Sequence, residues 1–572
     1  MKSSYAFASN IAQLTLRRYT YVTKGSPMRL RLCLFILSAS LSTALPVVGA
    51  VVQPLVKDAV TDLYRPLAFD QQRLSGLLAN RMRANVEGYL EHAVDHDVDQ
   101  QNVGEYLDAA ANTFDYTHDR NLGAAMEKAV KIALRRPSGD IVESRSHLLG
   151  LLSYYRVTAN EAAFAESKKL GDAVLDSPAD TRMLEPMIFL YKFTGDRRYL
   201  EYCGKLVDSA SAAGMESAPD PTNISRELSR LLGLAEFYRI TGDNDYLKTI
   251  TGTWRQIHDS RLTATGTLTG PAGRAETECV TLAWMQLTLE LFRLTGQPQY
   301  GDELEQTTYN QLLAGQDGRT GTIFTAVPLN GAKEAKPIDD CRNSVARGVS
   351  MIPALIWGRY GRGLAVNFYS AGSVTVMLRH SPDMRLSHRT VPRLYRGNVR
   401  LYEEANFPES GDVLLHVEPD YAFRFPVRFR VPSWTDSFAV SIGGTNVTGK
   451  PGQYVVLNRK WKRGDTVKIT MSLPLKLVNA TPSDTPTMAL KRGPQILSLP
   501  KVLNSEVEDL SAITLPAPQT ASPLKIVNYP TPLPAGWSGD QAYQIEGLLQ
   551  KPLVLVPFAD ARDYRTSFPV RP

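Results

Sequence analysis

A short phrase that recurs four times along the chain constrains the fold more than any other feature of the sequence. An aromatic and a basic residue precede Thr, and Gly follows in three of the copies, which are Tyr155–Thr158, Tyr191–Asp196, Tyr238–Asp243 and Phe292–Gly296. A glycine with positive φ can end a helix, and a following Asp can cap the next helix. Such helical hairpins must pack on one another, because a single pair of helices cannot bury its own apolar face.

The spacing of this phrase favours a closed ring over an open array. Its Thr residues stand 36, 47 and 54 positions apart, whereas tetratricopeptide-like arrays keep a fixed period. Irregular spacing is typical of a toroid with loops of varied length. We expect the toroid to occupy residues 51–365.

After residue 366 the pattern changes to short apolar runs punctuated by Gly, Pro and Asp. Examples are Asp412–Val417, Phe423–Val431 and Thr466–Met471. This pattern predicts an antiparallel β-sandwich over residues 366–500, followed by a linker and a small C-terminal β unit over 501–572. The expected fold class is therefore α + β and multidomain, with a toroid of helical hairpins ahead of the β-sandwich.

The net charge of +6 is confined to the first 50 residues, which carry six Lys and Arg residues and no acid. The remaining 58 basic and 58 acidic residues cancel. We find no basic stripe, so the sequence predicts no nucleic-acid partner.

Residues 1–50 have the character of an N-terminal extension followed by a signal peptide. Arginines precede an apolar run from Leu32 to Leu45, and small residues at Val48–Ala50 suit a signal peptidase. The run is short for a membrane span, which needs about 20 apolar residues. We therefore expect export to the periplasm or the extracellular space, with no membrane attachment after cleavage. An uncleaved N-terminal anchor is the alternative.

Two segments rich in acids and cysteine, each just ahead of a predicted helix, form the candidate functional site. Glu276, Glu278 and Cys279 make up the first, and Asp340 and Cys341 the second. Backbone N–H groups and the macrodipole at a helix start favour anions and lower the pKa of a thiol. If adjacent hairpins bring both segments to one mouth, their carboxylates and thiolates suit Zn²⁺. Helix capping alone is the alternative.

Further motifs resemble those of a known family. They are Gly233–Tyr238 and Thr308–Leu313 in the helical half, then Arg430–Trp434, Gly452–Tyr454, Arg459–Trp461 and Ala489–Pro494 in the β half. In this order, over residues 70–497, they are similar to the β-L-arabinofuranosidase-type glycoside hydrolases of family 127, formerly domain-of-unknown-function group 1680. The resemblance implies an (α/α)6 toroid of six hairpins followed by β-sandwich units. It also implies a catalytic Zn²⁺ held by Glu and cysteines, a cysteine nucleophile and a separate Glu as acid/base.

At the implied catalytic centre the chain departs from the family pattern. Cys279 corresponds to the cysteine of the family's Glu-x-Cys motif, but Thr277 stands where that motif has Glu, with acids on both sides. Cys341 corresponds to the second of two adjacent cysteines, and Asp340 replaces the first, which is the nucleophile. The implied metal ligands are thus Cys279, Cys341 and Glu278.

Three residues are expected to bind substrate, and the resemblance implies two of these positions. His147 corresponds to a sugar-contacting histidine of the family, Asn223 replaces another, and Tyr309 lies in the matched Thr308–Leu313 motif. For His147 a buried core histidine with satisfied hydrogen bonds is the alternative.

These residues leave several functions open. With Asp340 as nucleophile and Glu276 or Glu278 as proton donor, the chain is a retaining glycosidase for arabinofuranoside-like sugars, which requires carboxylates about 5–5.5 Å apart. Alternatively, the same groups bind Zn²⁺ for another purpose, or the chain is a non-catalytic glycan-binding protein with a degenerate site. A polysaccharide lyase on a similar toroid is a further alternative. In each case the expected ligand is an oligo- or polysaccharide.

Overall fold

The computed structural model describes residues 51–570 except 136–140, 213–223, 271–277, 336–341, 381–394, 483–486, 517–523, 536 and 538. The predicted signal peptide therefore lies outside the described residues. Within the described part of the chain, no helix combines the length and apolar character that crossing a membrane demands.

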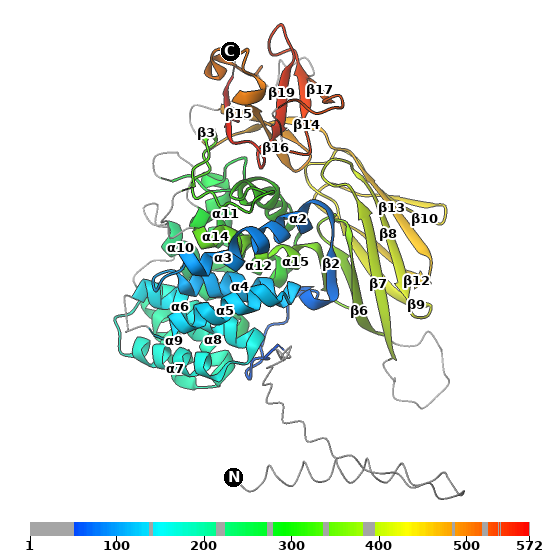
Figure 1. Cartoon of the computed structure of the whole chain (residues 1–572). Coiled ribbons are helices and arrows are strands. Elements are labelled where there is room, and N and C mark those ends of the chain that lie inside the picture. The colour runs from blue at the N-terminus through cyan, green and yellow to red at the C-terminus, as the bar shows by residue number, and fades with distance from the viewer. Residues whose placement is uncertain are drawn as a thin grey trace, which may run out of the picture. The chain divides into compact units, whose positions relative to one another are not determined.

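Helical hairpins form a closed ring in the first half of the chain (Figure 1). The inner helices of the described part contact one another in sequence, and the last contacts the first. They are α4 (Val103–Thr117), α6 (Ile141–Thr158), α8 (Leu184–Thr194), α10 (Ile224–Thr241), α12 (Glu278–Thr295) and α14 (Arg342–Ser350). The predicted toroid is thereby confirmed.

A second layer of helices packs outside this ring. Its members are α2 (Gly76–Asn85) with η2 (Val86–Leu90) and α3 (Glu91–His96), α5 (Arg120–Ala133), α7 (Glu161–Leu175), α9 (Arg197–Ala212), α11 (Asn244–Arg261), and α13 (Pro298–Thr307) with η4 (Thr308–Leu312). Short elements complete the helical part, namely η1 (Phe69–Gln71), η3 (Thr181–Met183) and α15 (Ile352–Ile356).

One end of the ring, which we call the far end, is built from two-residue turns between each inner helix and the next outer helix. The predicted glycines adopt positive φ there, 72° at Gly195, 74° at Gly242 and 62° at Gly296. His118 and Ala159 take the same left-handed conformation in the two turns that lack glycine. Side-chain caps then start the next helix from Asp243, as predicted, and also from Asp119 and Asn160, which the Gly-Asp pattern does not include.

The other end of the ring, which we call the mouth, carries the longer connections. They are residues 134–140, 176–183, 213–223, 262–277 and 313–341. Every inner helix after α4 begins at the mouth, so its free N–H groups face that end.

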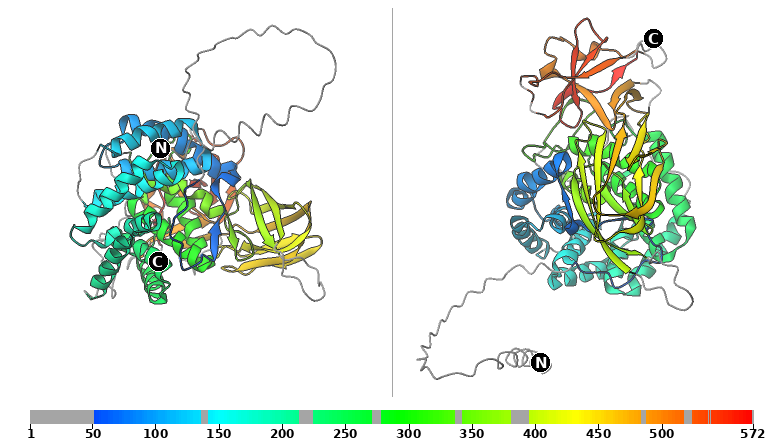
Figure 2. Two further views of the ribbon diagram at one scale, coloured as in Figure 1. Left: turned by 90° about the horizontal axis from the view of Figure 1, so that it is seen from below. Right: turned by 90° about the vertical axis from the view of Figure 1, so that its right-hand side faces the viewer.

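A β-sandwich lies beside the ring of helices (Figures 1 and 2). One sheet has the order β1 (Tyr64–Pro66), β4 (Trp357–Tyr360), β5 (Gly363–Val366), β9 (Phe423–Arg430), β12 (Tyr454–Trp461), with β5 parallel to β9. The other has the order β11 (Thr445–Thr448), β10 (Phe438–Ile442), β13 (Asp465–Met471), β8 (Asp412–Pro419), β7 (Tyr395–Ala405), β6 (Gly372–His380), β2 (Gln72–Leu74). The sandwich thus begins at residue 357 rather than 366 and takes one strand in each sheet from the N-terminal segment.

A third unit of β-structure follows the sandwich. Its sheet has the order β14 (Leu475–Asn479), β15 (Thr487–Arg492), β16 (Gln495–Pro500), β19 (Leu553–Pro557), β18 (Tyr543–Glu546), β17 (Lys525–Asn528). Three short strands extend it: β20 (Asp563–Arg565) pairs with β16, β3 (Asn330–Ala332) pairs with β20, and β21 (Phe568–Pro569) pairs with β15. Two short turns, η5 (Lys501–Leu503) and η6 (Leu510–Ala512), lie between β16 and β17. The unit starts at residue 475, so the expected boundary at 500 divides a continuous sheet.

Buried polar contacts fix the sandwich to the helical ring. Arg430 is 0% exposed and donates to Glu305 at 2.6 Å, while Trp434 Nε1 donates to the other oxygen of Glu305 at 2.7 Å. Arg430 also pairs with Asp302 on the same helix, α13. Two residues of the Arg430–Trp434 motif therefore join the sandwich to the outer layer of the toroid.

Candidate functional site

The two acid-and-cysteine segments lead into neighbouring helices at the mouth. Glu278 is the first residue of α12 and Arg342 the first of α14, and these two helices contact each other. The predicted site residues Glu276, Asn223, Asp340 and Cys341 lie outside the described residues. The helices that follow the two segments therefore lie side by side, while the convergence of the segments themselves stays a prediction.

Glu278 is held in the wall between the mouth and the C-terminal β unit. Its side chain is 2% exposed, and Gln311 Nε2 donates to its Oε1 at 2.9 Å. Thr265 Oγ1 in turn donates to Gln311 Oε1 at 2.8 Å. Burial raises the pKa of Glu278 to about 8, against the lowering effects of the Gln311 hydrogen bond and the nearby Lys333. Glu278 is consequently a neutral carboxylic acid at pH 7, able in principle to donate a proton.

The described donors do not fit a zinc ion. Cys279 is disulfide-bonded, whereas zinc requires a free thiolate. The Oε1 atom of Glu278 is already hydrogen-bonded to Gln311. Among the residues that the structure describes, no group of three or more His, Cys, Asp or Glu side chains is placed to hold a metal. We therefore derive no reaction step through zinc.

His147 occupies a structural position near the end of a helix. It is 2% exposed, and its Nε2 lies 3.1 Å from the carbonyl oxygen of Ala133, the last residue of α5. The carbonyl groups at a helix end lack partners within the helix, so this contact satisfies one of them. The geometry favours the core alternative over the predicted sugar contact.

Tyr309 lies in the core between the toroid and the sandwich. It is 1% exposed, and its ring contacts Phe368 and Phe407 at centroid distances of 6.2 and 5.6 Å. Its hydroxyl has no hydrogen-bond partner among the described residues. This position does not support the predicted substrate-binding role, because a sugar cannot reach the hydroxyl without displacing the packed rings.

A cavity of about 480 Å³, lined by both charged and apolar side chains, lies inside the ring of inner helices. Toward the mouth it is lined by Asp108, Glu185 and Arg347, which belong to α4, α8 and α14. Arg347 Nε donates to Asp108 Oδ2 at 2.7 Å, and Ser153 Oγ donates to Asp108 Oδ1 at 2.6 Å. Burial raises the pKa of Glu185, although Arg145 and Arg347 act in the opposite direction.

Toward the far end the cavity is lined by the basic residue of each copy of the recurring phrase. These residues are Arg156, Lys192, Arg239 and Arg293. Lys192 contacts Glu236 at 2.6 Å, and Arg293 contacts Glu290 at 2.6 Å. The repeat therefore encodes an inward-facing ring of positive charge as well as the turns.

An extended segment, residues 51–62, crosses the far end of the ring, and we call it the strap. Its backbone N–H groups donate to carbonyl oxygens of three inner helices, from Val52 to Arg156 at 2.7 Å, Val56 to Lys192 at 3.0 Å and Ala59 to Arg239 at 2.8 Å. These acceptors are the basic residues of three successive copies of the phrase. The strap thus satisfies carbonyl groups that the helix ends leave free.

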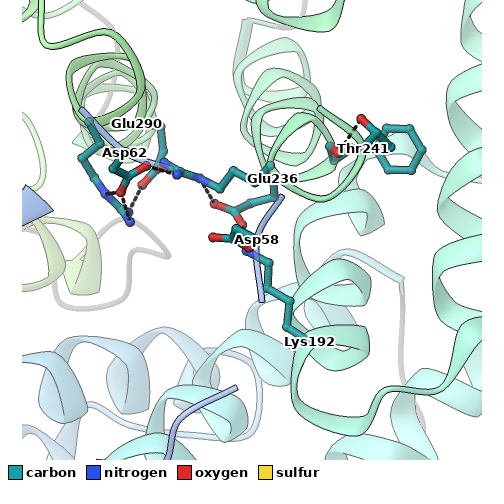
Figure 3. Close-up of polar contacts among 9 residues, drawn as sticks. Asp58, Asp62, Lys192, Glu236, Thr241 and Glu290 are labelled. Carbon is teal, nitrogen blue, oxygen red and sulfur yellow. Dashed lines mark hydrogen bonds and ion pairs between the residues drawn. The ribbon is translucent and has the colours of Figure 1, made fainter. Parts of the chain in front are cut away.

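Two acids of the strap enter the same charge network (Figure 3). Asp58 contacts Lys192 at 2.7 Å, and Asp62 pairs with both Arg239 and Arg293. Arg239 is 1% exposed and also pairs with Glu236 and Glu290 from α10 and α12. Because every one of these cations has an acidic partner, the far end is a neutralised network suited to stability.

Sequence reasoning missed the charged residues of the cavity, including Asp108, Glu185 and Arg347. One signal was available for the far end, because a basic residue recurs at a fixed place between an aromatic residue and Thr. No comparable repeat marks Asp108, Glu185 or Arg347 in the sequence.

Comparisons with known proteins agree with this architecture. Residues 145–353 match the model of the β-L-arabinofuranosidase GH127 catalytic domain, and residues 385–475 match that of the GH127 middle domain. A non-reducing end β-L-arabinofuranosidase from Bifidobacterium longum subsp. longum is 22% identical over 463 residues, which cover 65% of this chain and 67% of that protein.

Solved structures of the same family share the fold. A GH127 β-arabinofuranosidase superposes with a TM-score of 0.71 at 18% identity, covering 89% of this chain and 98% of the other. A GH127 β-L-arabinofuranosidase from Geobacillus stearothermophilus T6 gives a TM-score of 0.67 at 16% identity, covering 87% and 100%. With the catalytic and middle domains both matched and the architecture shared, the chain belongs to glycoside hydrolase family 127, a family whose substrates are carbohydrates.

Proposed function

We propose that this protein is an exported, retaining glycoside hydrolase that acts on arabinofuranoside-like sugars of glycans. The matched catalytic domain contains both acid-and-cysteine segments. The observation that carries the proposal is that these segments lead into two contacting helices, α12 and α14, at the mouth of a ring that encloses a cavity with charged side chains in its lining. Its volume of about 480 Å³ lies in the range of small-molecule sites.

In the proposed mechanism Asp340 is the nucleophile. Its carboxylate attacks the anomeric carbon while a neutral carboxylic acid, Glu276 or Glu278, protonates the departing glycosidic oxygen. Water then attacks the glycosyl–Asp340 ester, returns a proton to the same acid/base residue, and releases the sugar with its configuration retained. The raised pKa of Glu278, caused chiefly by burial, is the protonation state that the acid step needs.

The sugar would be oriented by the fixed polar groups of the cavity near the mouth. Asp108 and Arg347 hold each other in place, as do Glu185 and Arg145. Paired side chains lose little further entropy when a ligand binds, so they can position hydroxyl groups without reorganisation.

A non-catalytic glycan-binding protein is the second candidate function. Two specific observations favour it, the disulfide at Cys279 and the Asp at position 340 where the family has its nucleophilic cysteine. Export by the N-terminal segment belongs to the hydrolase proposal stated first. It is tested by N-terminal sequencing of the secreted protein, which we expect to begin near Val51.

The deciding experiment is hydrolysis of a panel of aryl glycosides, led by 4-nitrophenyl β-L-arabinofuranoside, by the wild type, Asp340→Ala and Asp340→Cys. We expect Asp340→Ala to lower kcat at least 1000-fold, an order of magnitude typical of a lost nucleophile. Turnover by the wild type that is unchanged in Asp340→Ala would contradict the mechanism, and sugar binding without turnover would favour the second candidate.

Zinc binding is tested separately by metal analysis of the reduced protein. The zinc hypothesis requires a stoichiometric ion that is lost in Cys279→Ala, and it is wrong if the reduced wild type holds none. Asp340→Cys restores the family's pair of adjacent cysteines, so it serves as the positive control for both zinc content and thiol-based turnover.

The lyase alternative is tested with acidic polysaccharides, because formation of an unsaturated uronate from them would indicate a lyase rather than a hydrolase.

A further inference from the structure

A second polar cavity, of about 710 Å³, lies outside the ring of helices. We call it the junction crevice, because its walls come from all three parts of the chain. The toroid contributes α2 and residues 316–319, the sandwich contributes residues 405–409, and the C-terminal unit contributes residues 539–541 and 559–562. No lining residue is shared with the cavity inside the ring.

Two ion pairs fix part of the wall of the crevice. Arg81 is 3% exposed, donates to the carbonyl oxygens of Leu313 and Gln316 at 3.1 and 2.6 Å, and pairs with Asp560. On the same wall Arg562 pairs with Asp317. The lining as a whole is balanced, so it carries no net charge that would select a charged ligand; its five cations are Arg81, Arg83, Arg319, Lys333 and Arg562, and its five carboxylates are Glu87, Asp317, Glu409, Asp540 and Asp560.

Amide side chains line the crevice from all three parts of the chain. Gln495 is 3% exposed and lines it, yet its Oε1 has no hydrogen-bond partner in the described part of the protein. Asn80, Asn406 and Gln541 also line the crevice, from the toroid, the sandwich and the C-terminal unit respectively. Amide side chains offer both donors and acceptors.

We propose that the junction crevice is a binding site for a neutral oligosaccharide, separate from the cavity inside the ring. Hydroxyl groups both donate and accept, so a sugar chain matches paired amides and neutralised charges better than an anion or an apolar ligand does. The amides of Asn80, Asn406 and Gln541 offer contacts to such hydroxyl groups from all three parts of the chain. The volume holds more than one sugar ring, which favours an oligosaccharide over a monosaccharide. The expectation that this oligosaccharide contains arabinose is the only part of the proposal that rests on the proposed function.

The test is isothermal titration calorimetry with three probes, arabinohexaose, maltohexaose and trigalacturonate. It uses the full chain carrying Asp340→Ala, so that no probe is hydrolysed. We compare it with the same chain carrying Gln495→Leu or Asn406→Ala, and with Gln544→Leu as a matched control on strand β18 away from the crevice. We expect a neutral hexasaccharide to bind, and either crevice variant to raise Kd at least fivefold while Gln544→Leu leaves it unchanged.

A second readout separates binding from folding. Gln495→Leu removes a buried polar atom that has no protein partner, so we expect its melting temperature to equal or exceed that of the parent. Its turnover of a small aryl glycoside in the wild-type background should be unchanged, which keeps this test independent of the proposed catalysis. The proposal is overturned if neither hexasaccharide binds, if trigalacturonate is preferred, or if Kd is insensitive to both crevice variants.

Discussion

The two ends of the helical ring differ in how they hold buried carboxyl groups, and two glutamates of one helix, α12, show the difference. Glu278 begins α12 at the mouth, and Glu290 lies near its other end, beside the strap. Burial raises the pKa of Glu278 to about 8. Burial would also raise that of Glu290, but Arg293 and Arg239 outweigh it and lower the pKa to about 2. The same residue type is therefore a neutral acid at one end and a fixed anion at the other.

The difference follows from what each end is built of. The far end consists of short repeated turns, a strap that satisfies helix carbonyls, and cations with several acidic partners each. The mouth consists of long, non-repeating connections that hold the candidate catalytic residues. The repeat thus specifies the far end of the ring, while the candidate catalytic residues lie in the sequence outside the repeats.

The largest effect on stability is expected from Arg239→Ala. This change leaves Asp62, Glu236 and Glu290 buried with fewer cations, and breaking a buried ion pair by removing one partner costs about 3–5 kcal/mol. Urea unfolding measures the loss. Arg463→Ala, at an exposed turn between β12 and β13, is the matched control and should change stability by less than about 0.5 kcal/mol. Equal effects of the two variants would show that the far end is not stabilised by its charge network.

The contrast within α12 predicts opposite pH dependences. For Glu290 the folded pKa of about 2 lies below the ordinary 4.5, so its stabilisation is complete above pH 4.5 and is lost as the pH falls toward 2. Glu290→Gln should therefore destabilise the protein by about 3 kcal/mol at pH 7, with a smaller difference at pH 3.

For Glu278 the folded pKa of about 8 lies above the ordinary 4.5, so the cost of keeping it buried is absent below pH 4.5 and grows up to pH 8. Glu278→Gln should match the wild type at pH 4.5 and be more stable at pH 8, by on the order of 4 kcal/mol. Urea midpoints measured at pH 3, 4.5, 7 and 8 test both variants. Parallel curves for the two substitutions would contradict the contrast.

A smaller effect is expected from the turns of the far end. An added Cβ at Gly242 meets only Val60 Cγ2 at 3.9 Å, but φ is 74°, so Gly242→Ala should cost about 1 kcal/mol through backbone strain alone. Ala159 already has φ of 56°, and Ala159→Gly should gain about 0.5 kcal/mol, because relief of strain exceeds the entropy cost of glycine. A loss of stability in Ala159→Gly would show that the left-handed conformation at Ala159 does not carry the backbone strain expected for Gly242→Ala.

Most of the fold could be predicted from the sequence, because the phrase that forms the turns of the far end recurs along the chain. The copies containing Gly195, Gly242 and Gly296 predict the turns, and the change of pattern near residue 366 predicts the sandwich. The boundaries were less accessible, because β1 and β2 belong to sheets whose other strands lie about 300 residues later. Such long-range pairing leaves no local signal.

Only part of the candidate site could be predicted from the sequence. The placement of the two acid-and-cysteine segments at helix starts follows from capping chemistry and agrees with the ends of α12 and α14. The roles of His147 and Tyr309 depend on burial in the assembled protein, where one contacts the Ala133 carbonyl and the other packs against Phe407. Arg347 and Asp108 meet only when the ring closes, so neither can be paired from local sequence.

The central claim, that Asp340 at the mouth attacks the sugar, is tested most directly by trapping the covalent intermediate. The wild type is incubated with a 2-deoxy-2-fluoro-L-arabinofuranosyl donor, and the labelled peptide is identified by mass spectrometry. The account predicts one glycosyl adduct per chain, attached to Asp340 and absent from Asp340→Ala. An adduct on Cys341, or full turnover with no adduct on Asp340, would contradict it.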